Sequence, residues 1–247
     1  MKIKGIDVSK HQGTIDFAKV KNDGIEFVII RIGYGGSAPV KDEKFEDNYK
    51  KAKANGLKVG VYLYSYADSE SDIEIELKKT IEWLDNREID LPVYFDVEDE
   101  KEQGKLSVET LSNLVLKYCD GIEKAGYWAG IYASKSWLET KLNMYKLNRF
   151  TVWVAQWSNM LTYLGNYGMW QYTSNGSVAG IQGRVDMNYQ LKELGGKINT
   201  SNKKSNDEIA TEVIEGKWSN GNERKNRLSN AGYDYSAVQK IVNERLK

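Results

Sequence analysis

Apolar and polar positions alternate in a regular rhythm over the first half of the chain. Short runs rich in β-branched and aromatic residues stand at Ile3–Val8, Phe27–Ile32, Val59–Tyr64, Pro92–Val97 and Tyr127–Tyr132. Amphipathic stretches lie between them, at Lys44–Ala54, Ser71–Leu84 and Ser107–Ala125. In the second stretch the apolar residues recur at helical spacing, at Ile73, Leu77, Ile81 and Leu84. This alternation predicts a parallel sheet covered by helices, either a barrel or an open doubly wound sheet.

From Thr151 onward the rhythm changes. Strand-like segments are found at Thr151–Trp157, Gly168–Thr173 and Gly183–Asn188, separated by short gaps rich in Gly, Asn and Ser. No full helix fits into these gaps, so we expect β-hairpins, and not further βαβ units, to close the sheet. The pattern favours an irregular α/β barrel of five βα units with hairpin-rich closing strands over a regular eightfold barrel.

The last part of the chain has a different composition. We assign residues 1–194 to the barrel and residues 195–206, which are small and polar, to a flexible linker. Residues 207–247 predict a small module of three helices, Asp207–Glu215, Asn222–Ala231 and Tyr235–Leu246. Its apolar residues could form one core: Ile209, Val213, Trp218, Leu228, Tyr233, Val238, Val242 and Leu246. A module of about 40 residues is near the lower limit for independent folding.

Charge and composition exclude several classes of function. The 247 residues carry 35 basic and 35 acidic side chains, which gives no electrostatic basis for binding nucleic acid. One Cys and one His cannot form a disulfide or a usual zinc site, and they make Ser-His-Asp catalysis unpromising. We therefore expect no metal and no cofactor. What remains is plentiful carboxylate and an excess of Tyr and Trp, 16 and 7 against 5 Phe.

Targeting signals are missing from the sequence. Met1–Ser9 contains no apolar run of signal-peptide length, and no segment approaches the roughly 18 apolar residues of a membrane-spanning helix. We expect a soluble product, made in the cytoplasm and not inserted into a membrane, that must be released if it acts elsewhere.

Carboxylates stand at the ends of predicted strands. Asp96 and Glu98 end the fourth run and, two residues apart, would face the same side of the sheet. Asp7 ends the first run and Asp186 the last, and these strands are neighbours in a closed barrel. Paired carboxylates push one pKa upward, which provides the proton donor and the anion that glycoside cleavage needs. The alternative is a structural role for each residue: Asp96 and Glu98 would open a solvated loop, and Asp7 and Asp186 would be a helix cap and a turn residue.

Aromatic residues gather at the same strand ends. These residues are Tyr34, Tyr62, Tyr64 and Tyr132 in the first half, and Trp153, Trp157, Trp170 and Tyr172 in the closing region. Flat rings with polar rims suit the faces of sugars, whereas ordinary core packing is the alternative, which we expect for Trp153.

The motifs together resemble glycoside hydrolase family twenty-five, the Chalaropsis-type lysozymes common among phage endolysins and bacterial autolysins. The resemblance rests on Gly5–Gly13, Gly60–Tyr64, Phe95–Glu98, Trp170–Tyr172 and Val185–Asn188, and it covers residues 1–191. It implies a flattened barrel and N-acetylmuramidase activity, the hydrolysis of the β-1,4 bond between N-acetylmuramic acid and N-acetylglucosamine in peptidoglycan.

The resemblance also implies roles for single residues. Glu98 matches the general acid/base, and Asp96 matches its partner, which stabilises the developing cation or orients the substrate's N-acetyl group. Asp7 and Asp186 match two further carboxylates on the floor of the cleft. The expected substrate-binding residues are Tyr34, Tyr62, Tyr64, Trp157, Gln171 and Tyr172. Arg31 replaces a common Lys, and His11 is expected to be a structural or subsite residue. A covalent or an oxazolinium intermediate both remain open.

Segments of the tail resemble the cell-wall-binding repeat family called CW seven. They include Gly216–Arg224 and Ala231–Tyr235, and the residues expected to bind are Trp218, Arg224 and Tyr233. The family implies a three-helix module that binds the muropeptide. Only one copy is visible, so a homo-oligomer would be needed for avidity.

Three functions are compatible with these observations. The first is a phage endolysin for lysis of the host cell, and the second is a bacterial autolysin with the same activity. The third is a non-catalytic carbohydrate-binding barrel, against which the intact Asp96–Glu98 pair argues. A chitinase-like enzyme would need more spaced acids before Glu98 than the sequence has.

Overall fold

The computed structural model describes residues 2–194, 205–230 and 233–246. Contacts divide the chain into two compact units, Met1–Ile198 and Asn199–Lys247. Most of the expected linker, residues 195–204, lies outside the described residues. Its last residue, Asn206, begins α6 (Asn206–Ile214) instead, and the hydroxyl of Ser205 caps this helix by accepting from the backbone N–H of Glu208.

Among the described residues, the first unit contains one nine-stranded sheet, whose strand order is β1-β9-β8-β7-β6-β5-β4-β2-β3. The strands are β1 (Ile3–Val8), β2 (Phe27–Tyr34), β3 (Val40–Lys41), β4 (Lys58–Tyr64), β5 (Val93–Asp96), β6 (Ala129–Ser134), β7 (Thr151–Ala155), β8 (Met169–Gly176) and β9 (Val185–Gln190). Because β1 also pairs with β2, the sheet closes into a barrel, with β3 as a short strand beside β2. The expected α/β barrel is confirmed.

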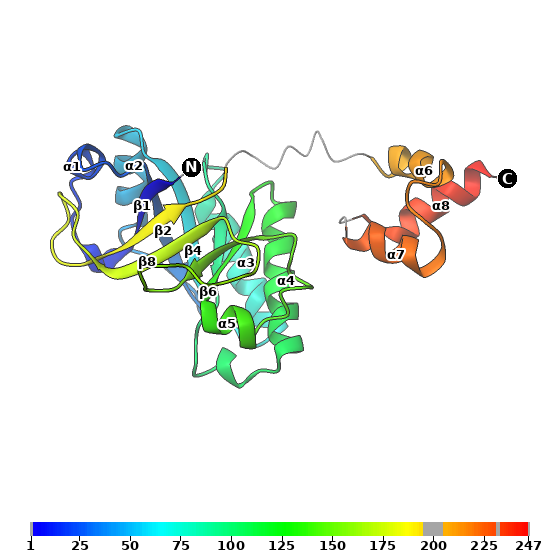
Figure 1. Ribbon diagram of the computed structural model, residues 1–247, viewed down its shortest axis with the longest axis horizontal. Coiled ribbons are helices and arrows are strands. Elements are labelled where there is room, and N and C mark those ends of the chain that lie inside the picture. Colours follow the sequence, from blue (N-terminus) through cyan, green and yellow to red (C-terminus); the bar gives the residue numbers. More distant parts are fainter. Residues whose placement is uncertain (1, 195–204, 231–232, 247) are drawn as a thin grey trace. The chain divides into compact units, whose positions relative to one another are not determined.

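Helices lie on the outer face of the parallel strands (Figure 1). They are α1 (Phe17–Asn22), α2 (Phe45–Ala54), α3 (Glu70–Leu84), α4 (Val108–Lys124) and α5 (Lys135–Thr140), with 3₁₀ turns at Lys10–Gln12 and Gln103–Lys105. The three expected helices are confirmed as α2, α3 and α4. Gly56 and Gly126 follow α2 and α4 with φ of 70° and 87°, the left-handed conformation that favours glycine after a helix.

The closure of the barrel differs from the expected hairpins. β9 is antiparallel to both β8 and β1, but β7 and β8 are parallel, with Trp153 opposite Met169. Parallel neighbours need a crossover connection, and residues 156–168 make it without a helix. The expectation of hairpins throughout the closing region is therefore wrong for this pair of strands.

Two apolar layers support the barrel. One lies between the sheet and the helices, and the other fills the interior below the carboxyl ends of the strands. Phe27 is fully buried in the interior, and a Cβ at Gly5 would lie 2.2 Å from its ring. Gly5 therefore leaves the space that this ring fills. Large apolar side chains fill the lower part of the barrel interior, so the polar side chains of the site lie near the open end of the barrel.

The second unit consists of α6, α7 (Gly221–Asn230) and α8 (Tyr235–Arg245). Its core is formed by Ile209, Ala210, Val213, Leu228, Val238 and Val242. Leu246, which we expected in this core, is 67% exposed because α8 ends before it. None of the helices in the described ranges is long and apolar enough to cross a membrane.

Candidate active site

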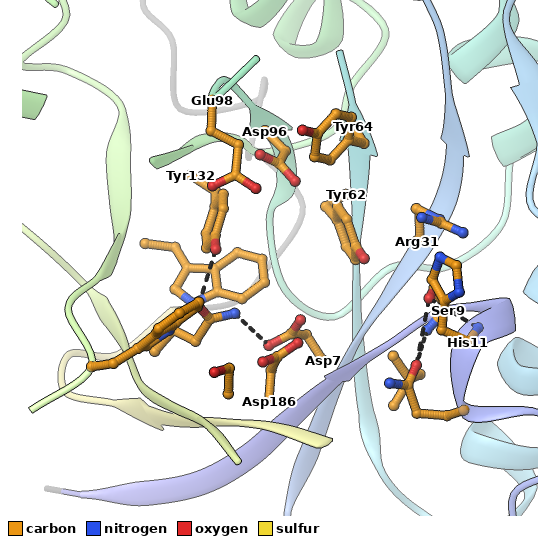
Figure 2. Close-up of a pocket in the computed structure, with 16 residues that line it drawn as sticks. Asp7, Ser9, His11, Arg31, Tyr62, Tyr64, Asp96, Glu98, Tyr132 and Asp186 are labelled. Atoms are coloured by element: carbon orange, nitrogen blue, oxygen red, sulfur yellow. Dashed lines mark hydrogen bonds between the residues drawn. The ribbon is translucent and has the colours of Figure 1, made fainter. Parts of the chain in front are cut away.

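A pocket of about 400 Å³ opens among the carboxyl ends of the strands (Figure 2). It brings together the four carboxylates expected from the sequence, Asp7, Asp96, Glu98 and Asp186. Of the expected substrate-binding residues it includes Tyr62, Tyr64, Trp157 and Gln171. The closing of β1 onto β9 places residues 7 and 186 at one rim, although they are far apart in the sequence.

Asp7 and Asp186 face each other across the antiparallel β1–β9 ladder. Asp7 is only 5% exposed, and its Oδ2 accepts hydrogen bonds from Gln171 Nε2 at 3.0 Å and Asn188 Nδ2 at 2.8 Å. Burial, followed by repulsion from Asp186, raises the pKa of Asp7 to about 8. Burial also raises the pKa of Asp186. Repulsion between the two carboxylates favours the state in which one of them is protonated.

Asp96 and Glu98 lie on the other side of the pocket, as Figure 2 shows. Asp96 is the last residue of β5 and is buried, and burial followed by repulsion from Glu98 raises its pKa well above the usual range. Glu98 is partly exposed to the pocket; burial followed by repulsion from Asp186 raises its pKa to about 7. At neutral pH a carboxyl group with this pKa is protonated in a large fraction of the molecules, and these can donate the proton.

Aromatic side chains form the walls of the pocket. Trp153 is 1% exposed, and its ring centroid lies 4.4 Å from that of Tyr132 and 6.0 Å from that of Tyr62. Trp157, in contrast, is 64% exposed at the rim, with its indole N–H bonded to Gln171. Trp153 is thus the core residue that we expected but also lines the pocket, and the ring of Trp157 is largely exposed at the rim.

Two expected substrate-binding residues lie outside this pocket lining. Tyr172 neighbours Gln171 on β8, and since side chains alternate along a strand, it points to the outer face of the barrel. There its ring stacks on Tyr189 with centroids 4.4 Å apart. Tyr34 ends β2, with Arg31 and Lys10 over its ring.

Asn188 had no role assigned from the sequence, yet its side chain donates a hydrogen bond to Asp7. Its place two residues after Asp186 on one strand was the signal for a shared face. Tyr132 and Trp153, two of the aromatic residues expected at strand ends, line the pocket. His11, in the 3₁₀ turn after β1, lies at the far end of the pocket together with Ser9 and Arg31 (Figure 2), and Gln12 of the same turn also lines the pocket. Arg31 is held by a buried ion pair with Asp42 at 2.8 Å.

A buried carboxyl group outside the pocket joins the loops that surround it. Glu76 on α3 accepts hydrogen bonds from the backbone N–H of Gly36, from the Ser65 hydroxyl at 2.7 Å and from the backbone N–H of Tyr66 at 3.2 Å. Gln103 donates to the same hydroxyl and accepts from the backbone N–H of Asp99. The loops after β2, β4 and β5, which follow Tyr34, Tyr64 and Asp96, are thereby tied together.

The residues expected to bind the cell wall lie in the second unit. The rings of Trp218 and Tyr233 meet edge to face at 5.9 Å, and the Trp218 indole donates to Glu212 at 3.0 Å. The guanidinium of Arg224 donates to the Ser219 carbonyl and to the side chains of Asn220 and Gln239. Arg224 therefore connects the start of α7 to α8.

Comparison with known proteins identifies both units. The model of glycosyl hydrolases family 25 matches residues 6–181, and that of the CW_7 repeat matches residues 207–246. The autolytic lysozyme of Clostridium acetobutylicum is 30% identical over 186 residues, which cover 75% of this chain and 55% of that protein. The lysozyme of Streptococcus phage Cp-7 is 31% identical over 183 residues, which cover 66% of this chain and 48% of that protein.

Solved structures agree with this comparison. The modular autolysin LytC from Streptococcus pneumoniae has a TM-score of 0.69 and 34% identity, covering 77% of this chain and 47% of that one. This chain thus spans about half the length of the relatives named here. The match over most of the barrel shows that the chain belongs to glycosyl hydrolase family 25, with a CW_7 repeat following the barrel.

Proposed function

We propose that the protein is an N-acetylmuramidase that hydrolyses the β-1,4 bond between N-acetylmuramic acid and N-acetylglucosamine in peptidoglycan. The observation that carries the proposal is Glu98, a carboxyl group with a pKa raised to about 7 beside Asp96 in an aromatic-walled pocket. Membership of family 25 supports it, as do relatives named as a phage lysozyme and a bacterial autolysin.

The proposed mechanism uses carboxyl groups. Glu98 donates its proton to the glycosidic oxygen, and the C1–O bond breaks as positive charge develops on the sugar ring. Asp96 stabilises this cation or orients the N-acetyl group, the two roles that the family resemblance implies. Water then adds at C1 and returns a proton to Glu98, so that the acid is restored. Trp157 provides a ring face on which a sugar can stack.

We propose further that the second unit binds the peptide-bearing sugar of the wall and keeps the barrel near its substrate. The match to the CW_7 repeat and the Trp218–Tyr233 pair support this role.

Replacing Glu98 by Gln tests the assignment of the acid. Without the proton donor, release of reducing ends from purified bacterial walls should fall by about 100-fold or more. The matched control is Glu102→Gln, which removes an exposed carboxylate paired with Lys105 and should leave the rate unchanged. Wall binding, measured by sedimentation with the walls, should be retained by both variants.

Mass spectrometry of the digested walls identifies the bond. After borohydride reduction, the proposal requires reduced muramic acid at the new ends. Reduced glucosamine at those ends, or full activity of Glu98→Gln, would contradict it. Binding without any new reducing end in the unmodified protein would indicate the carbohydrate-binding barrel instead.

A further inference from the structure

Indole N–H groups fix the orientation of the two amides that touch Asp7. The Oε1 atom of Gln171 accepts from Trp157 Nε1 at 2.9 Å and from the Tyr132 hydroxyl at 3.0 Å. In the same way, Oδ1 of Asn188 accepts from Trp153 Nε1 at 2.7 Å. An indole nitrogen can only donate, so neither amide can be turned over without setting two donors against each other.

Both amides therefore present N–H groups to the same oxygen of Asp7. Gln171 Nε2 and Asn188 Nδ2 lie 3.0 Å and 2.8 Å from Oδ2. A proton on Oδ2 would point toward these two N–H donors and weaken their hydrogen bonds to this oxygen. Each hydrogen bond lost in a buried site destabilises the fold. Asp186 faces Asp7 across the β1–β9 ladder, where two like charges would repel.

We propose that Gln171 is a positioning residue: its amide, held by Trp157 and Tyr132, reserves Oδ2 of Asp7 as an acceptor and confines the proton shared with Asp186 to Oδ1 of Asp7 or to Asp186. Gln171 thereby links the exposed ring at the rim to the buried carboxyl pair. Its kinetic consequences rest on the proposed muramidase activity.

The charge on Asp186 connects this arrangement to Glu98. Asp186 is the carboxylate whose repulsion helps to raise the pKa of Glu98. The titratable and charged groups that surround Asp7 are Asp186 from β9, Asp96 and Glu98 from the end of β5, and, from β2, β4 and β6, Arg31, Tyr62 and Tyr132. If the amide turns over, Oδ2 can carry the proton and donate it to Gln171. Asp186 then keeps its full charge, and the pKa of Glu98 rises.

A double-mutant cycle tests whether the two donors act through one amide. Tyr132→Phe removes one donor and keeps the ring, and Trp157→Phe removes the other and leaves a smaller aromatic ring. Because Trp157→Phe also shrinks the ring proposed to stack on a sugar, its own effect is expected in KM. Each single variant retains one donor to Oε1, so neither should move the alkaline limb of the pH profile of kcat on soluble glycan fragments. In the double variant the amide is free to turn, and kcat should fall by about 30-fold or more, with KM close to that of Trp157→Phe. Its loss of activity at alkaline pH should also move to higher pH.

The control is Tyr118→Phe, which removes a buried hydroxyl bonded to Thr80 outside the pocket. It reports how much a missing tyrosine hydroxyl affects folding alone. The proposal is overturned if the fold-decrease in kcat of the double variant equals the product of the fold-decreases of the two single variants. It is also overturned if the alkaline limb of the double variant's pH profile does not move. An inactive parent protein would instead refute the proposed function and leave the arrangement of protons to be tested on stability.

Asparagine substitutions supply that second measurement. Asn at position 7 can offer its oxygen to both amides and its NH₂ group to Asp186, so Asp7→Asn retains every hydrogen bond. Asp186→Asn instead forces the charge onto Asp7, which is only 5% exposed. At pH 8 the Tm of Asp7→Asn should exceed that of Asp186→Asn by about 3 °C or more. The reverse order would contradict the proposed placement of the proton.

Discussion

Burial of carboxyl groups at single positions makes the stability of the barrel depend on pH. The pKa values of Asp7, Glu76 and Glu98 are raised to about 8, 7 and 7. In the unfolded chain these groups titrate near pH 4, so between about pH 4 and pH 8 the folded state binds more protons. Their contribution to stability is therefore fully present below pH 4 and is lost as pH rises through the folded-state values.

Because the folded state binds more protons than the unfolded chain in this range, we expect the Tm of the protein to fall between pH 5 and pH 8. Calorimetry at constant ionic strength should show the decrease, and Asp7→Asn should make it shallower, because one of the raised groups is removed. Surface carboxylates such as Asp16, whose pKa is lowered by hydrogen bonds to Lys19, act in the opposite direction at lower pH. A Tm that rises steadily from pH 5 to pH 8 would show that these acids are not buried as described.

The position of the carboxylates could be predicted from the sequence, but their partners could not. Asp7 and Asp96 stand near the carboxyl ends of β1 and β5, which meet at one rim of a barrel. The expectation that Asp186 ends the last strand is wrong: it stands at the start of β9 and reaches the same rim because β9 runs antiparallel to β1. The hydrogen bond from Asn188 to Asp7 joins residues that are 181 positions apart, and no local pattern encodes it. Tyr172 shows the converse: a residue adjacent to Gln171 in a motif points to the opposite face of the strand.

At the scale of elements, one glutamate on α3 connects three loops. Glu76 is fully buried, and its partners lie in the loops after β2 and β4; through Ser65 it also reaches Gln103, near Glu98. Replacing Glu76 by Gln at pH 8 would turn one acceptor oxygen into a donor that faces other donors. We expect a loss of about 1–3 kcal/mol in the free energy of unfolding, measured by urea denaturation.

Glu74→Gln is the matched control for this prediction. Glu74 lies on the same helix, is exposed, and pairs only weakly with Lys117, since surface ion pairs contribute less than about 1 kcal/mol. If the two substitutions had equal effects, the hydrogen bonds of Glu76 would not be holding the loops. Activity should fall with Glu76→Gln alone, because the loop after β5 carries Glu98.

The elements that the sequence predicted correctly are those with long, regular patterns. α3 and α4 repeat their apolar positions over several turns, and Gly56 and Gly126 mark helix ends through their backbone conformation. α1 and α5 have six residues each, too few for a period to be recognised. The direction of β8 relative to β7 depends on how the barrel closes, which the short, polar gap between them does not reveal.

At the scale of the whole molecule, two units with separate cores are joined in one chain. If the second unit binds the wall, tethering raises the effective concentration of the barrel at its substrate, and this gain needs no contact between the units. Cleavage of intact walls should then depend on the second unit, whereas cleavage of soluble fragments should not.

Removing residues 207–247 should therefore lower the rate on intact walls at low enzyme concentration by about 10- to 100-fold. The rate on soluble fragments should remain within about twofold, since the barrel has its own core. The decisive control is a mixture of the shortened barrel and the separate second unit: because the gain comes from covalent linkage, adding the unit in trans should not restore the rate. Restoration in trans would mean that the second unit acts on the wall or on the barrel directly, and equal losses on both substrates would mean that it supports folding.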